Sequence, residues 1–151
     1  MMESPAVRRL RTGRQVTDMA TRETTGRALA TGKLLSALLL LAMGAIHLYL
    51  VFDGVGGVLG VLFVLNAIGG LVLAIAMLVL RGGLLTLATV LSLLFMAGTL
   101  LALVLALTVG LFGITESLDF TLVPTTLVVE SIGTVVLAVM TALLVRGRAA
   151  A

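Results

Sequence analysis

The chain has 151 residues, of which 60% are hydrophobic and 11% are charged. This balance excludes an ordinary soluble domain, in which about a quarter of residues are charged, and indicates a single integral membrane domain. Ten Lys and Arg against seven Asp and Glu give a formal charge of +3, and the absence of cysteine excludes disulfides, thiolate metal sites, iron–sulfur clusters and cysteine nucleophiles.

Residues 1–32 form a polar, arginine-rich segment with no apolar face that repeats at helical spacing. We therefore expect a disordered basic tail that stays in the cytoplasm. Two other interpretations are an organelle transit peptide, which such a composition also fits, and a signal peptide with the next apolar run as its core. That run is too long for a signal-peptide core, and no clean small-residue cleavage site follows it.

Four apolar runs come next, and each is long enough to cross about 30 Å of hydrocarbon as a helix. The second run begins after a glycine-rich connection at Asp53, and the third begins after Arg81. The fourth run carries Pro124 in its first turn, where a missing N–H costs nothing. The predicted fold is an all-α bundle of four transmembrane helices, with a membrane domain over 33–146 and a short tail over 147–151. The expected spans are 34–52, 58–80, 84–108 and 123–145.

The distribution of charge predicts the orientation of these helices. With four crossings, the N-terminal tail, the loop at Arg81 and the C-terminus lie on one side, and all ten basic residues fall there. The opposite loops carry only the acids Asp53, Glu116 and Asp119. The positive-inside rule therefore predicts a multi-pass plasma-membrane protein with both termini in the cytoplasm. We expect membrane lipid, and no nucleic acid, as the partner of the basic residues.

Small residues recur at every fourth position of the third run, at Gly98, Ala102, Ala106 and Gly110. Such a stripe lets transmembrane helices approach one another closely. We expect it to serve packing within the bundle, because this spacing is also common by chance in helices rich in Gly and Ala.

Few polar side chains fall inside the predicted spans. By helix rise, His47 lies roughly 8 Å and Glu130 roughly 9 Å below the outer ends of the first and fourth spans, and Asn66 lies roughly 13 Å deep on the second. A carboxylate in hydrocarbon costs several kcal/mol unless it is protonated or paired, so Glu130 is expected to face inward toward a partner. His47, Asn66 and Glu130 are therefore the candidate intramembrane polar site.

Two interpretations of this site stay open. In the functional interpretation, the site opens to the outer face, His47 and Glu130 exchange a proton, and Asn66 orients one of them. In the structural interpretation, the same groups form a hydrogen-bonded or ionic clasp that fixes the order of the helices.

The sequence offers no catalytic constellation, so we expect no enzyme activity of the chain alone, no metal site and no bound cofactor. A single histidine without cysteine cannot hold zinc or copper within one chain, and bis-histidine haem would need a second protomer. No nucleophile elbow places a serine beside His47. The spans also provide little polar lining for a channel, unless an oligomer forms one.

The segments GAIHLYL (44–50), FVLNAIGG (63–70) and TVGLFGITES (108–117) resemble small four-span membrane proteins common in actinobacteria. The resemblance covers residues 34–145 and implies no particular activity. It implies polar positions at His47, Asn66 and Glu116, with Glu130 as a further candidate.

The predicted function is therefore that of an accessory or interaction protein of the plasma membrane. We expect it to bind a membrane-protein partner or to form a homo-oligomer. One alternative is a redox- or proton-transfer-linked membrane subunit with a quinone or haem site near His47 and Glu130. The other alternative is a small oligomeric transporter or channel.

Overall fold

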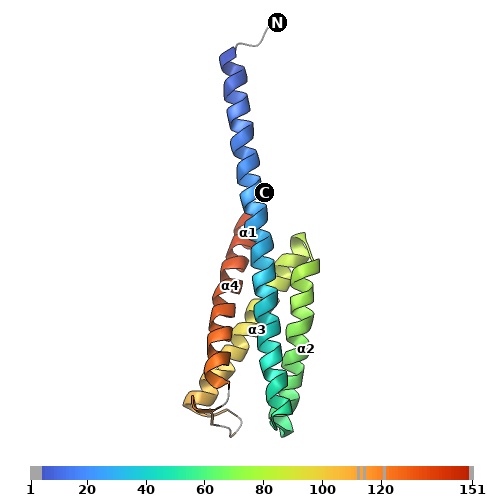
Figure 1. Cartoon of the computed structure of the whole chain (residues 1–151), viewed down its shortest axis with the longest axis vertical. Helices are drawn as coiled ribbons and strands as arrows, with labels where there is room; N and C mark the ends of the chain where they lie inside the picture. Colours follow the sequence, from blue (N-terminus) through green and yellow to red (C-terminus); the bar gives the residue numbers. More distant parts are fainter. Residues whose placement is uncertain (1–4, 112, 114, 121, 150–151) are drawn as a thin grey trace. The chain divides into compact units, whose positions relative to one another are not determined.

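The computed structural model describes the backbone of residues 5–111, 113, 115–120 and 122–149, and the side chains of residues 19, 23–111, 113, 115–120 and 122–148. These residues form four helices and no β-strand, which confirms the predicted all-α fold. The helices are α1 (Pro5–Phe52), α2 (Gly57–Val79), α3 (Gly82–Thr108) and α4 (Val123–Ala149), as Figure 1 shows.

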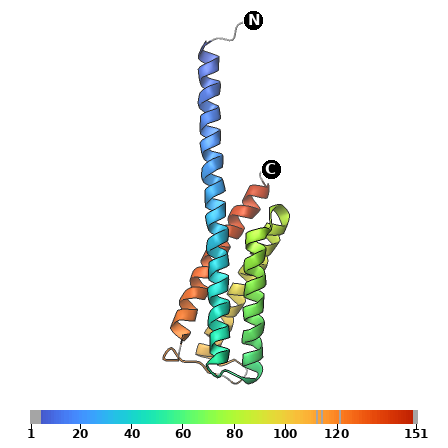
Figure 2. The ribbon, with the colours of Figure 1, turned by 45° about the vertical axis from the view of Figure 1, so that its right-hand side comes forward.

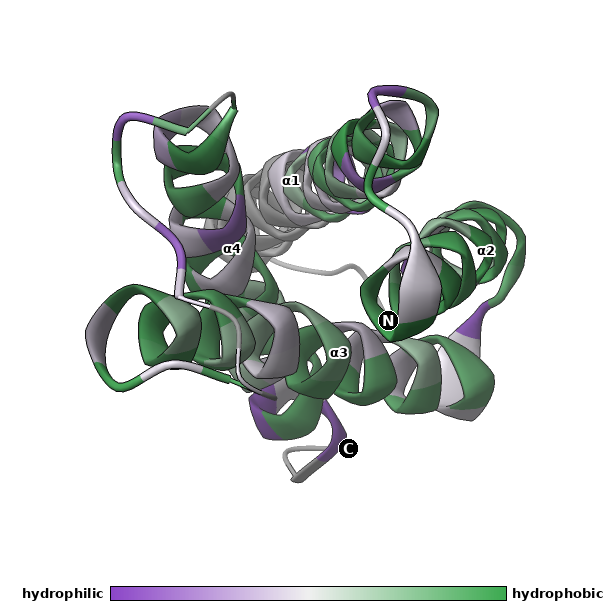
Figure 3. Cartoon of the chain, turned by 90° about the horizontal axis from the view of Figure 1, so that it is seen from below, coloured by the Kyte–Doolittle hydropathy of each residue, from purple (hydrophilic) through white to green (hydrophobic). Residues whose placement is uncertain are grey.

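All four helices contain a segment long and apolar enough to cross a membrane, so the chain has the architecture of a multi-pass membrane protein. Large apolar side chains such as Val61, Val72, Leu101 and Val135 point away from the bundle and are exposed. Figure 3 shows this apolar character on the outward faces of the helices as well as on the inward faces. Such an apolar outer surface is suited to lipid, because its exposure to water would be unfavourable.

The chain divides into an N-terminal unit that ends at Gly32 and a membrane unit that begins at Lys33. Within the N-terminal unit, the backbone is helical from Pro5 onward, which differs from the prediction of a disordered tail. Proline suits a first helical turn, and the exposed side chains of Glu23 and Arg27 form an ion pair of 2.7 Å one turn apart. An apolar stripe is not needed here, because a turn added to an existing helix bears no new nucleation cost. Residues 1–4 of the predicted tail lie outside the described residues.

In the membrane unit, the α1–α2 and α3–α4 connections lie at one end of the bundle, and the α2–α3 turn lies at the other (Figure 1). The first of these connections holds Asp53, and the last holds Glu116 and Asp119. At the α2–α3 end, the Lys33 ammonium donates hydrogen bonds of 3.0 Å to the carbonyl oxygens of Leu78 and Leu80. Lys33 thereby satisfies acceptors that the last turn of a helix leaves free.

Glycines set the closest approach between α1 and α2, which lie side by side in Figures 1 and 2. A Cβ atom on Gly70 would lie 2.9 Å from the carbonyl oxygen of Leu40, and one on Gly44 would lie 3.3 Å from the backbone of Ala67. Because helices in lipid gain little from the hydrophobic effect, such backbone contact is a main source of their association.

Replacement of Gly70 by alanine is expected to destabilise the bundle by about 1–3 kcal/mol, the usual cost of overpacking. The added methyl group would meet backbone, which cannot rotate away, whereas a Cβ on Gly98 of α3 would meet nothing within 4 Å. Gly98→Ala is therefore the matched control, and it should leave the unfolding midpoint unchanged or raise it slightly. Thermal unfolding of both variants in mild detergent measures the difference, and equal midpoints would contradict the predicted contact.

Candidate functional site

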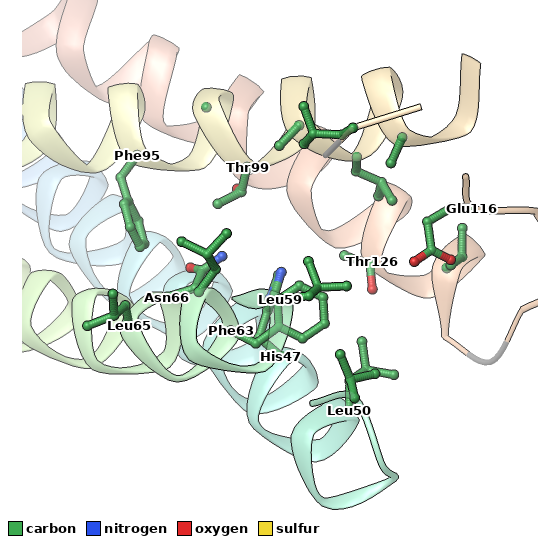
Figure 4. Close-up of a pocket in the computed structure, with 18 of the residues that line it drawn as sticks. His47, Leu50, Leu59, Phe63, Leu65, Asn66, Phe95, Thr99, Glu116 and Thr126 are labelled. Atoms are coloured by element: carbon green, nitrogen blue, oxygen red, sulfur yellow. The ribbon is translucent and has the colours of Figure 1, made fainter. Parts of the chain in front are cut away.

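A cavity of about 510 Å³ lies in the membrane unit, at the end where the α1–α2 and α3–α4 connections lie (Figure 4). It is partly open, because wall residues such as Leu65 and Leu94 are exposed on the surface of the bundle. Its wall is mostly apolar. It contains leucines of α1, α2 and α3 and the rings of Phe63, Phe95 and Phe120. A few polar side chains interrupt this wall. They are His47, Asn66, Thr99, Glu116 and Thr126.

The small residues of α3 explain why the cavity exists. Gly98, Ala102 and Ala106 all line it, so this part of the predicted stripe borders the cavity. A Cβ atom built on Gly98 meets no atom within 4 Å. At Gly98 the stripe leaves room for the cavity, and the expectation that the stripe serves helix packing stays a prediction for its other residues.

His47 lies on α1 with its ring buried against the edge of Phe63, at a centroid distance of 4.7 Å and an interplanar angle of 88°. Its Nδ1 atom is 2.9 Å from the carbonyl oxygen of Met43. A carbonyl oxygen can only accept a hydrogen bond, so Nδ1 carries a proton and donates it. Nε2 is consequently the ring nitrogen that is free to gain or lose a proton.

Glu130 lies on α4 with 0% of its surface exposed, and its Oε1 atom is 4.0 Å from Nε2 of His47. Neither carboxyl oxygen has a hydrogen-bond partner among the residues that the structure describes. The two groups are thus neighbours that face each other without a direct hydrogen bond. A gap of this size can be closed by a small side-chain rotation or by a bridging water molecule.

Asn66 lies on α2, and its side chain lines the cavity. Its Oδ1 atom is buried and accepts no hydrogen bond within the described part of the chain. The structure therefore brings His47 and Glu130 together, but it does not show Asn66 orienting either of them through this atom. Asn66 instead offers an unused acceptor to whatever occupies the cavity.

Of the three acids on the loops, only Glu116 reaches the cavity wall. Its backbone N–H donates a 3.0 Å hydrogen bond to the carbonyl oxygen of Ala106, which holds the α3–α4 connection against the end of α3. Figure 4 shows the Glu116 carboxylate at the loop side of the cavity, beside Thr126. Asp53 and Asp119 are exposed on the two connections.

Sequence reasoning missed Thr99 and Thr126 as wall residues. The Thr99 hydroxyl donates to the Met96 carbonyl at 2.8 Å and also lies 3.3 Å from the sulfur of Met43 on α1. The Thr126 hydroxyl donates to the Leu122 carbonyl at 2.8 Å. Both hydroxyl protons are therefore used by the protein, so each oxygen can still accept a hydrogen bond. The one available signal was the position of Thr99 directly after Gly98 in the small-residue stripe.

Taken together, these groups suit a molecule with a large apolar part and few polar atoms. The wall can accept hydrogen bonds at Asn66, Thr99 and Glu116, and it can exchange a proton at His47. No group of three or more His, Cys, Asp or Glu side chains that could hold a metal ion occurs in the described residues. Comparisons of the chain with protein-family models, with curated proteins and with solved structures found no match.

Proposed function

We propose that this chain is an accessory protein of the plasma membrane that binds one small, mainly apolar organic molecule inside its bundle. The cavity is the observation that carries this proposal. Its volume of about 510 Å³ falls in the range of about 300–1,000 Å³ that is usual for small-molecule sites. Its combination of apolar wall and few polar groups is also the combination found in such sites.

The pair of His47 and Glu130 favours a second candidate, a subunit that takes part in proton transfer or in redox chemistry with a quinone-like molecule. Nε2 of His47 is free to exchange a proton, and it faces the buried carboxyl group of Glu130 at 4.0 Å. A cavity beside such a pair could bind a molecule whose chemistry releases or takes up protons. No observation favours the transporter or haem alternatives in the same way.

For the orientation, we propose that both termini lie in the cytoplasm and that the cavity end faces outward. The described basic side chains of the membrane unit are those of Lys33, where this unit begins on α1, of Arg81, on the α2–α3 turn, and of Arg146 and Arg148, in the last turn of α4. The connections at the cavity end carry acids only. This asymmetry is the one that the positive-inside rule describes.

The proposed function predicts that a small molecule co-purifies with the protein and is lost when the cavity is filled. Gly98→Leu fills the cavity, because its side chain would extend from a position with nothing within 4 Å of the Cβ atom. Leu101→Phe is the matched control, because Leu101 lies on the same helix, is 58% exposed and faces away from the cavity.

The measurement is the absorbance and mass spectrum of organic extracts from equal amounts of purified wild type, Gly98→Leu and Leu101→Phe. We expect one compound enriched in wild type and Leu101→Phe and reduced at least about tenfold in Gly98→Leu, as for a site whose volume has been filled. The same thermal midpoint in both variants would show that loss of the compound is not loss of the fold. Identical extracts from all three proteins would refute the proposed function.

A further inference from the structure

The charges around the cavity are of one sign. Glu116 places a carboxylate in its wall, and Oε1 of Glu130, which is not a wall residue, lies 4.0 Å from Nε2 of His47. No described Lys or Arg side chain lines the cavity. Those of the membrane unit lie toward the other end, where Lys33 binds the last carbonyls of α2 and Arg148 lies against Gly83.

An anion in this cavity would meet the Glu116 carboxylate, and His47, the one base in the described wall, already faces the Glu130 carboxyl group. A cation would be attracted by the Glu116 carboxylate. The apolar wall strengthens this attraction, because apolar surroundings screen charges weakly. The backbone at Glu116 is held in place, since its N–H donates a hydrogen bond to the end of α3.

The aromatic side chains of the wall add a second preference for positive charge. Phe63, Phe95 and Phe120 line the cavity, and they come from α2, α3 and the α3–α4 connection. The face of a phenyl ring attracts a cation within about 6 Å. An alkyl or aryl ammonium group can interact with these rings in two ways: its positive charge is attracted to the ring faces, and its apolar substituents pack against the rings.

Resting on the proposed function, we infer that the molecule bound in this cavity is an amphiphilic organic cation. Amines and quaternary ammonium compounds with apolar substituents belong to this class. The positive charge lies near Glu116 at the loop side, and the apolar part extends among the phenyl rings toward Gly98. Asn66 and Thr99 supply acceptors for any N–H group that the cation carries.

The test uses two probes of the same shape and opposite charge, tetraphenylphosphonium and tetraphenylborate, with neutral triphenylphosphine oxide as a third. Equilibrium dialysis against the full-length protein in a nonionic detergent measures binding of each probe. The Gly98→Leu variant gives the background of partition into detergent and onto the outer surface. The inference predicts that the phosphonium binds at least about tenfold more tightly than the borate.

Two carboxylates on the same connection provide the matched pair of variants. Glu116→Gln removes the charge in the cavity wall and should weaken phosphonium binding about tenfold, while Asp119→Asn removes an exposed charge outside it and should change binding less than about twofold. Equal effects of the two variants would overturn the inference, because the charge would then act only at long range.

The outcomes separate this inference from the proposed function. If the neutral or anionic probe binds wild type above the Gly98→Leu background and as tightly as the phosphonium, the cavity is a binding site and its preference for cations is refuted. If no probe exceeds that background, the inference fails together with the use of the cavity as a site for molecules of this size.

Discussion

Replacement of His47 by leucine is expected to destabilise the folded bundle by about 3 kcal/mol, the usual cost of removing one partner of a buried pair. The variant removes the imidazole that faces the Glu130 carboxyl group, which is 0% exposed and has no hydrogen-bond partner among the described residues. Glu130→Leu should cost less, about 1 kcal/mol, because His47 keeps its hydrogen bond to the Met43 carbonyl through Nδ1. Unfolding in detergent or in bicelles, followed as the free energy of unfolding, measures both variants.

The double variant with leucine at positions 47 and 130 should recover most of this loss, since two apolar side chains then face each other. Thr141→Val is the control, because the Thr141 hydroxyl donates only to the Leu137 carbonyl of its own helix. It should change the free energy of unfolding by about 0.5 kcal/mol or less. Additive effects of the two leucine substitutions would show that the pair does not interact, and both interpretations of His47 with Glu130 would then fail.

Single cysteines on the two sides of the membrane should differ completely in their labelling by an impermeant reagent. The chain contains no cysteine, so single variants can be labelled without background. A membrane-impermeant maleimide added to intact cells should label Ser117→Cys, on the α3–α4 connection, and should not label Arg148→Cys, near the end of α4. The physical reason is that basic segments are retained on the cytoplasmic side.

Lysed cells provide the control for this experiment, because both positions are exposed in the folded protein and should then react equally. Labelling of Arg148→Cys alone in intact cells would reverse the proposed orientation and would place the cavity at the cytoplasmic face. Labelling of both positions in intact cells would be inconsistent with four crossings.

The helices of the membrane unit could be predicted because their ends have local causes. Apolar runs of the right length stop at the Asp53 connection and at Arg81, and α4 begins at Val123 beside Pro124. The proximity of His47 and Glu130 followed from their similar depth on two helices of a small bundle. The helix over residues 5–32 could not be predicted from an apolar pattern, because its sequence has none and it continues into an apolar helix.

The cavity could not be read from the sequence, because a stripe of small residues has two opposite consequences. At Gly70 the backbone of Leu40 occupies the space that a side chain would need, whereas at Gly98 this space is empty. Only the positions of the neighbouring helices decide between the two. The role of Glu116 depends likewise on a tertiary contact, the hydrogen bond from its backbone to Ala106, which the spacing of the two residues does not indicate.

Native mass spectrometry of the protein released intact from mild detergent tests most directly whether the bundle binds a small molecule. The proposed function predicts a single added mass of one molecule per chain on wild type and on Leu101→Phe, and the bare mass of the chain for Gly98→Leu. Bare chains in all three samples, or the same added mass on Gly98→Leu as on wild type, would contradict a binding site in this cavity.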